Sequence, residues 1–244
     1  MTGEKRTDYV NIPPFETEDL RRNLVTFLDS EFDDPFNGGK RRVGNFRWGV
    51  YIFYDYDGEP IYVGQTNEML RTRIRRHLTN QRTDAVAMSV LDPFEVYEIE
   101  VFPLPQFQNI TSAADRATAR AYLNALEHSV YGNAISGSQF KAILNEKDPP
   151  APTVPIDTPP SFKMRVVSDE VAKIRSHPDF RIARRSLIIS RLAQVISERK
   201  VQGGLRRVLL TQAKRLQWLA DRRYQALGGA ASVETETNEE GDND

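Results

Sequence analysis

The pattern of hydrophobic and polar residues predicts a β-hairpin in the first third of the chain. Two strand-like runs cover residues 49–56 and 60–64, and Asp57-Gly58 lies between them. Asp-Gly between two such runs is a strong hairpin signal, because both residues of a two-residue turn must accept positive φ. A third strand is expected over residues 94–101.

Apolar residues spaced three or four positions apart predict the helices. The expected helices cover residues 16–29, about 67–79, 112–131, 169–176, 183–199 and 205–227. Thr111 or Ser112 is the expected cap of the long third helix, because a hydroxyl at that position accepts a bond from the first free amides.

Composition divides the chain into five expected segments. Residues 1–45 form an acidic extension with one helix, residues 46–146 a folded domain, and residues 147–162 a stiff linker with six prolines. Residues 163–228 form a basic helical region, and residues 229–244 form an acidic, disordered tail.

The formal net charge of −1 hides a strong asymmetry between these segments. Residues 163–227 carry 16 Lys and Arg against five Asp and Glu, whereas residues 233–244 hold six acids and no base. A basic block of this kind favours a surface that binds a polyanion. Two alternatives stay open: the basic helices are simply solvated, or they form a helical hairpin that packs on the domain or dimerises.

Several functional classes are excluded by composition. The chain has no cysteine, which removes disulfides, thiolate zinc sites and cysteine nucleophiles together. No stretch approaches the roughly 20 apolar residues needed to cross a bilayer, so no membrane partner is expected and the cytoplasm is the default location. The three histidines lack metal-site spacing, and there is no glycine-rich phosphate loop.

Counting outward from the two-residue turn assigns the hairpin residues to two faces. Tyr51 pairs with Gly64, and Phe53 with Tyr62, so these four residues share one face. The opposite face receives Val50, Ile52, Tyr54, Ile61 and Val63. Tyrosines in strands are most often packing residues, so this pattern alone favours a core over a site.

Two further groups of residues have both a structural and a chemical interpretation. Arg73 and His77 are four apart and project from one side of a helix, in a segment with five arginines and no acid. Arginine suits phosphate, but such a helix is as often merely solvated. Glu127 lies inside an apolar helix, where a lone carboxylate needs a cation or a donor. A surface position or a salt bridge is the plain explanation, and a magnesium ligand is the sharper one.

Together these residues resemble the GIY-YIG nuclease superfamily. The ordered motifs are Gly49-Val50-Tyr51, Tyr62-Val63-Gly64, Arg73 with His77, and Glu127 on a later helix. The asparagine that usually follows that helix is best matched by Asn145, with Asn133 as the alternative. Gln65 follows the second triplet, where relatives often carry a lysine or a small residue. The resemblance covers about residues 47–146.

The resemblance implies an α+β fold with a small three-stranded antiparallel sheet flanked by helices, here followed by a C-terminal helical extension. It also implies a divalent-metal-dependent endonuclease that hydrolyses phosphodiester bonds in DNA, with Mg²⁺ or Mn²⁺ as cofactor. On that interpretation Glu127 holds the metal and Arg73 stabilises charge on the phosphate. Tyr51 takes a proton from the attacking water and Tyr62 orients that water, with His77 as the alternative proton shuttle. Asn145 completes the expected catalytic set.

The candidate DNA-binding residues lie on two helices. They are Arg71, Arg75 and Arg76 on the helix after the hairpin, and Arg206, Arg207, Lys214 and Arg215 on the last helix. Contacts of these side chains with phosphates would make DNA binding strongly dependent on salt. A non-cleaving nucleic-acid-binding module on the same scaffold is the alternative function, and an interaction protein with a chance motif match is a third. Cutting both strands with one site per chain would favour a homodimer.

Overall fold

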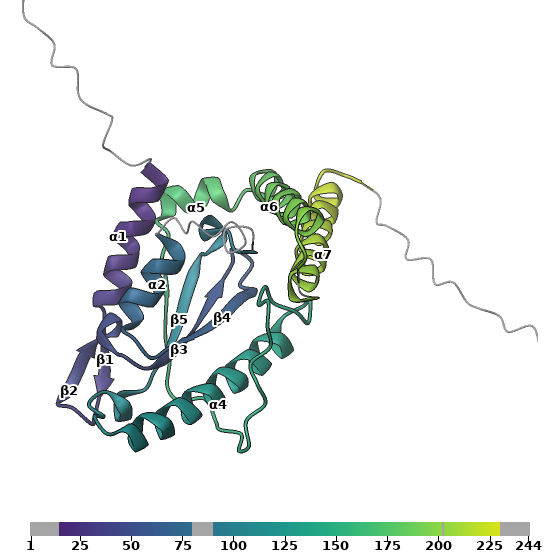
Figure 1. The fold of residues 1–244 in the computed structure, drawn as a ribbon. Coiled ribbons are helices and arrows are strands. Elements are labelled where there is room, and N and C mark those ends of the chain that lie inside the picture. The colour runs from purple at the N-terminus through teal and green to yellow at the C-terminus, as the bar shows by residue number, and fades with distance from the viewer. Residues whose placement is uncertain (1–14, 80–89, 202, 230–244) are drawn as a thin grey trace, which may run out of the picture.

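The computed structural model of the protein describes residues 15–79, 90–201 and 203–229 (Figure 1). Its helices are α1 (Phe15–Asp29), α2 (Leu70–Leu78), α4 (Ala113–Gly137), α5 (Asp169–Arg175), α6 (Pro178–Glu198) and α7 (Gly203–Ala226). Its strands are β1 (Glu31–Asp34), β2 (Gly39–Arg42), β3 (Gly49–Tyr54), β4 (Pro60–Thr66), β5 (Glu98–Pro103) and β6 (Phe162–Arg165). Residues 230–244, which make up nearly all of the expected acidic tail, lie outside the described residues.

The central sheet has four antiparallel strands in the order β4-β3-β5-β6, so the expectation of three strands is wrong. The extra strand, β6, pairs with β5 along its whole length. Phe162 and Met164 pack against the core, whereas Lys163 and Arg165 are exposed. This alternation is only four residues long, and two of the four residues are basic. The strand was therefore not predicted, because composition assigns these residues to the end of a linker and the start of a basic helical region. A separate hairpin, β1-β2, precedes the sheet.

The expected register of the β3-β4 hairpin is confirmed. Tyr51 lies opposite Gly64 and Phe53 opposite Tyr62. Tyr51, Phe53 and the partly buried Tyr62 pack in one hydrophobic cluster. The side chains that were assigned to the opposite face pack in a second cluster, except Ile61, which joins the first.

The turn of this hairpin differs from the expected two-residue type, which explains the position of Ile61. The amide of Asp55 donates to the carbonyl of Glu59 at 3.0 Å, and the amide of Gly58 donates to the carbonyl of Asp55 at 3.1 Å. Gly58 has a φ of 75°, so the loop has three residues and ends on a left-handed glycine. A register shift beside Tyr54 then restores the pairing farther along the strands. The longer turn and the register shift cancel, so only Ile61, which lies at the shift, changes face.

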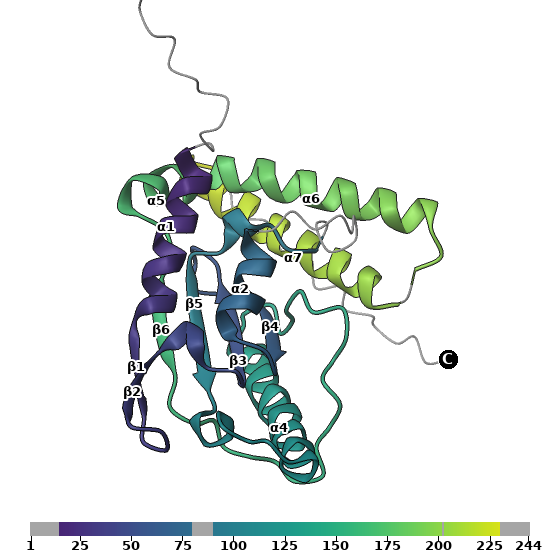
Figure 2. The same cartoon turned by 60° about the vertical axis from the view of Figure 1, so that its left-hand side comes forward.

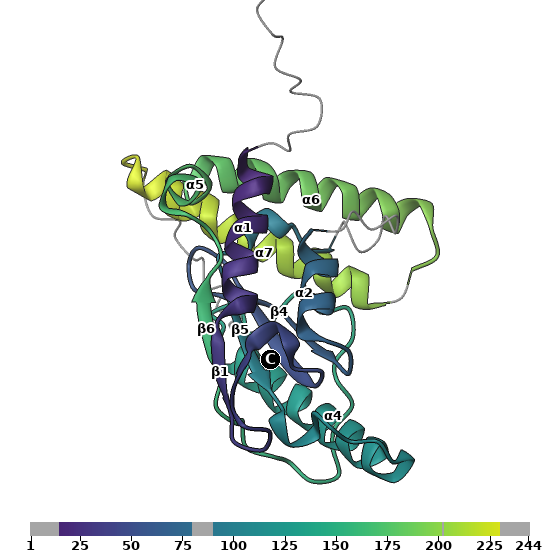
Figure 3. The ribbon, with the colours of Figure 1, turned by 90° about the vertical axis from the view of Figure 1, so that its left-hand side faces the viewer.

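Helices cover both faces of the sheet. α1 and α2 lie side by side on the face that carries Tyr51 and Phe53, as the turned view shows (Figure 3). α4 covers the opposite face, where Leu123, Leu126 and Val130 meet the second cluster. The helix is fixed at its start because the Ser112 hydroxyl accepts from the amide of Asp115 at 3.0 Å.

The C-terminal helices are packed against the sheet and are not held apart from it. α6 and α7 lie next to each other across the end of the sheet that carries the β3-β4 turn (Figure 2). Leu192, Leu205 and Val208 complete the same hydrophobic cluster as Tyr51. The proline-rich segment before β6 also packs, since the Ser129 hydroxyl on α4 donates to the carbonyl of Ile156 at 2.7 Å.

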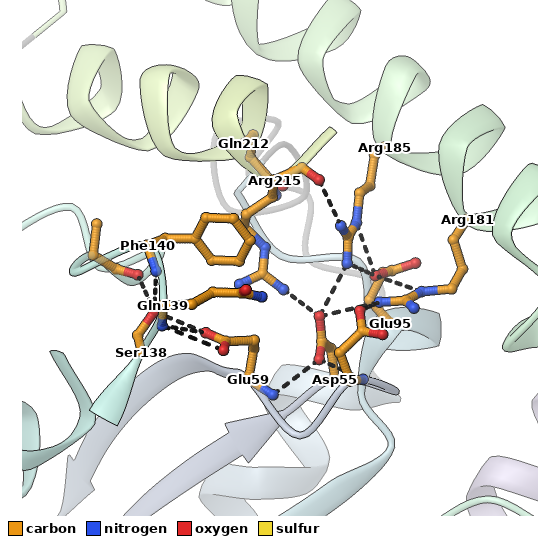
Figure 4. Close-up of polar contacts among 12 residues, drawn as sticks. Asp55, Glu59, Glu95, Ser138, Gln139, Phe140, Arg181, Arg185, Gln212 and Arg215 are labelled. Atoms are coloured by element: carbon orange, nitrogen blue, oxygen red, sulfur yellow. Dashed lines mark hydrogen bonds and ion pairs between the residues drawn. The ribbon is translucent and has the colours of Figure 1, made fainter. Parts of the chain in front are cut away.

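A buried network of charges joins these helices to the hairpin turn (Figure 4). The Asp55 carboxylate, 1% exposed, accepts hydrogen bonds from Arg181 at 3.1 Å, from Arg185 at 3.0 Å and from Arg215. Arg185 also donates to Glu95 at 3.0 Å. Because a buried charge is costly without a partner, these ion pairs tie α6 and α7 to the loop that connects β3 and β4.

No helix among the described residues combines the length and the apolarity that a membrane-spanning segment needs.

Candidate active site

The candidate site is built around Tyr51, whose ring lies against the edge strand of the sheet. Tyr51 is on β3, is fully buried, and runs its phenol over Gly64 on the edge strand β4. A Cβ atom built on Gly64 would lie 2.4 Å from the Tyr51 hydroxyl oxygen, far inside van der Waals contact. The glycine of the second triplet is therefore required because it leaves room for the tyrosine of the first.

Three rings pack together around this hydroxyl. The Tyr51 and Tyr62 ring centroids are 6.3 Å apart, and the His77 ring lies 5.8 Å from Tyr51 and 5.3 Å from Tyr62. His77 comes from α2, and the two tyrosines come from the hairpin, so the helix and the hairpin share one aromatic cluster.

Arg73, one turn before His77 on α2, is the cation that acts on Tyr51. Burial raises the pKa of the Tyr51 hydroxyl well above its ordinary value, as does Tyr62, while the charge of Arg73 and its approach to the hydroxyl oppose that rise. The buried Nε of Arg73 has no acceptor among the described residues. The site thus holds a protonated phenol beside a guanidinium that keeps a donor free for an anion.

Glu127 approaches the same place from α4. Burial raises its pKa to about 7, with Arg73 acting in the opposite direction. Glu127 also raises the pKa of Tyr51, which places all three groups in one electrostatic site. β3, α2 and α4 therefore bring together a hydroxyl, a guanidinium and a carboxylate that are far apart in the sequence.

The donor set at Glu127 fits a hard divalent cation held largely by water. No group of three or more His, Cys, Asp or Glu side chains that could hold a metal occurs among the described residues. A carboxylate whose pKa is raised by burial gains stability from a nearby cation, and Mg²⁺ commonly binds one or two carboxylates and keeps several waters. Glu127 is the residue that could hold such an ion.

Asn145, expected in the catalytic set, makes two hydrogen bonds to the backbone of β4. Its side-chain oxygen accepts from the amide of Val63 at 3.0 Å, and its side-chain nitrogen donates to the carbonyl of Val63 at 2.7 Å. It is 8% exposed, so both ends of the amide are used by the backbone of β4. Asn145 thus positions β4, the strand that carries Tyr62 and Gly64.

A cleft opens beside the Arg73 side chain. Its lining consists of Gln65, Thr66, Asn67, Glu68, Arg73, Arg120, Leu123 and Asn124. The Gln65 amide donates to Asn124 at 3.0 Å, which joins the end of β4 to α4. Arg120 and Asn124 were not predicted from the sequence. Arg120 is four residues before Asn124, and Asn124 is three before Glu127, so this spacing puts all three on one side of α4.

The candidate DNA-binding residues fall into two groups. Arg215 is 1% exposed and is bound to Asp55, so its assignment to DNA binding is corrected. Arg71 is paired with Asp29 at 2.5 Å, Arg76 with Glu68 at 2.7 Å, and Arg207 with Asp148 at 2.8 Å. Three of the candidates are exposed and form no ion pair within the described chain, namely Arg75, Arg206 and Lys214.

Comparison with known proteins identifies part of this site. Residues 47–110 match the family model of the GIY-YIG catalytic domain, which confirms the resemblance of the sequence motifs. The matched segment contains both triplets, Arg73 and His77, and ends before α4 with Glu127. Neither the curated proteins nor the solved structures contain a significant match to the chain.

Proposed function

We propose that this chain is a divalent-metal-dependent endonuclease that hydrolyses phosphodiester bonds in DNA. The observation that carries the proposal is the convergence of Tyr51, Arg73 and Glu127 at one edge of the sheet, in a segment that includes the GIY-YIG match. A phosphate bound there would meet a cation, a hydroxyl and a carboxylate, which are the groups that phosphodiester hydrolysis needs.

Arg73 binds and stabilises the scissile phosphate. Its buried Nε lacks an acceptor among the described residues, so a phosphate oxygen can take that bond without displacing a protein partner. A guanidinium aimed at the phosphate stabilises the charge that grows in the transition state, which is worth about 10²–10³ in rate for one such donor.

Tyr51 and His77 together move the proton of the attacking water. Because burial keeps Tyr51 protonated, it can accept a proton only if it releases its own. His77 packs against Tyr51, and imidazole is the side chain that accepts protons in the neutral range. Tyr51 therefore takes the proton of the water as its hydroxyl proton passes to His77, while the oxygen of the water bonds to phosphorus and the bond between phosphorus and the 3′ oxygen breaks. The departing 3′ oxygen then takes a proton from solvent and becomes a hydroxyl. Tyr62, beside both rings, orients the water.

Glu127 would hold Mg²⁺ or Mn²⁺ at this site. When bound, the ion supplies Lewis-acid polarisation of the scissile phosphate and stabilises the leaving oxygen. The carboxylate must be ionised to bind the ion, and its pKa of about 7 makes metal binding weaken as the pH falls below neutrality.

A non-cleaving DNA-binding module is the second candidate function. It is favoured by the exposed basic residues Arg75, Arg206 and Lys214 but needs neither the buried hydroxyl nor the desolvated carboxylate. Keeping a buried acid charged is costly, so the position of Glu127 beside Arg73 supports the catalytic proposal. The described residues give no support to a homodimer, and the proposal concerns one chain acting on DNA.

Incubation of the full chain with supercoiled, linear and branched DNA tests the proposal. Cleavage is expected with Mg²⁺ or Mn²⁺ and is lost with a chelator. Glu127→Gln and Arg73→Gln should each abolish most activity, whereas the matched exposed changes Glu198→Gln and Arg191→Gln should not. Tyr51→Phe, His77→Ala and the double variant should lose similar activity, because two groups in one relay act as a unit. Cleavage that needs no metal, or that survives Glu127→Gln, would overturn the mechanism.

A further inference from the structure

A second cleft continues the one beside Arg73. It is lined by Arg47, Trp48, Asn67, Ile110, Arg116 and Arg120. The two clefts share Asn67 and Arg120, so together they form one depression that we call the α4 groove. The groove therefore leads from the candidate active site toward the start of α4.

The polar residues of α4 follow the groove. Arg116, Arg120, Asn124 and Glu127 are separated by four, four and three residues, which places them along one side of the helix. At about 1.5 Å of rise per residue, Arg116 lies roughly 16 Å from Glu127 along the helix axis. One face of a single rigid helix thus carries both the candidate metal ligand and two arginines beyond it.

The groove has an excess of positive charge that the protein does not compensate. Its lining contains four arginines and one carboxylate, Glu68, which is already bound by Arg76 at 2.7 Å. Arg47, Arg116 and Arg120 are exposed and form no ion pair within the described part of the chain. By contrast, Arg181, Arg185 and Arg215 on the basic helices are buried against carboxylates.

We infer that the α4 groove binds the sugar-phosphate backbone of the DNA strand next to the scissile phosphate, with Arg116 and Arg120 each holding a separate phosphate. The inference rests on the proposed function, because it takes DNA as the ligand. Its support is the continuity of the groove with Arg73 and the suitability of free guanidinium groups for phosphate. The two arginines are about 6 Å apart along the axis, which allows each to meet a different phosphate.

The inference predicts the path of the substrate strand over the surface of the protein. The strand leaves the site along α4, on the opposite side of the sheet from α1 and α2. Arg47, in the segment that precedes β3, lines the far part of the groove and would contact the same strand. These contacts are with phosphate, so they fix the position of DNA and add no preference for a base sequence.

Salt-dependent binding of a fluorescein-labelled DNA duplex to the full chain, in chelator to prevent cleavage, tests this inference. Each phosphate contact contributes about 0.9 to the slope of log affinity against log salt. Arg116→Gln/Arg120→Gln should therefore weaken binding and reduce the slope by about 1.8. Arg21→Gln/Arg191→Gln, which removes two exposed helix charges elsewhere, should change neither quantity. Arg116→Lys/Arg120→Lys should keep most of the slope.

The outcomes separate this inference from the proposed function. An unchanged slope in Arg116→Gln/Arg120→Gln, with metal-dependent cleavage by the natural chain, would overturn the groove and leave the nuclease proposal intact. A reduced slope without cleavage by the natural chain would support DNA phosphate binding in the α4 groove and overturn the nuclease proposal. Circular dichroism and the unfolding midpoint of each variant should match those of the natural chain, because all four positions are exposed.

Discussion

Replacing Asp55 by Asn is expected to destabilise the protein strongly, because it leaves three buried guanidinium groups with too little negative charge. Asp55 is 1% exposed, and its Oδ2 accepts from Arg181, Arg185 and Arg215. Arg181 and Arg185 keep Glu95 as a partner. Arg215, also 1% exposed, has Asp55 as its only ion pair within the described chain.

The expected cost is about 3–5 kcal/mol, which is the usual cost of removing one partner from a buried ion pair. For a chain of this size it corresponds to a fall in melting temperature of about 6–20 °C. Urea unfolding followed by circular dichroism gives the free energy, and tryptophan fluorescence follows Trp48 beside the sheet and Trp218 on α7.

Two companion variants make the result specific. Asp169→Asn removes an acid that is 78% exposed and paired with Arg165, so it should cost less than about 1 kcal/mol. Adding Arg215→Met to Asp55→Asn removes the stranded charge and should recover part of the loss. A loss below about 1 kcal/mol for Asp55→Asn, or strictly additive losses in the double variant, would refute this account of the network.

Two other predictions concern the site itself. Burial raises the pKa of Glu127 to about 7, so ionisation of this carboxyl destabilises the folded chain. The stability that the neutral carboxyl allows is fully present below about pH 4.5 and is lost as the pH rises through 7. Glu127→Gln should therefore be more stable than the natural chain at pH 8, by roughly 1–3 kcal/mol, yet inactive. Equal stability of the two chains in thermal unfolding at pH 8 would count against burial as the cause of the raised pKa. Asn145→Ala leaves the amide and carbonyl of Val63 without partners and should cost about 2–5 kcal/mol in urea unfolding. A variant of natural stability that lost only activity would contradict this structural role and favour a catalytic one.

The site could be predicted from the sequence where local geometry determines it. Strand alternation and a register counted from the turn place Tyr51 and Tyr62 on one face, and this prediction held because the register shift beside Tyr54 offsets the longer turn. The spacing of Arg73 and His77 likewise fixes their common direction on α2. Glu127 could be singled out because a carboxylate between apolar helix residues requires an explanation.

The remaining features depend on contacts between distant segments. Arg215 looks like any other arginine of a basic helix, and its burial follows from Asp55, which is 160 residues away in the sequence. Asn145 looks the same in a sequence whether its amide binds a substrate or a strand. β6 is too short and too basic to be distinguished from a loop. Counting charges therefore favoured α7 as the DNA-binding surface, although Arg207 and Arg215 on that helix are paired with carboxylates. Three exposed arginines without an ion pair among the described residues line the α4 groove, and their position there follows from the packing of α4.

The bonds made by residues 144 and 145 also bear on self-association. β4 is an edge strand, and a bare edge is a template on which a second polypeptide can add a strand. Here the amide of Leu144 donates to the carbonyl of Ile61 at 2.8 Å, and the Asn145 amide occupies both backbone groups of Val63. The chain thus covers the outer backbone of its own β3-β4 hairpin at Ile61 and Val63. Release of this short segment would convert that hairpin into a nucleus for intermolecular β-pairing.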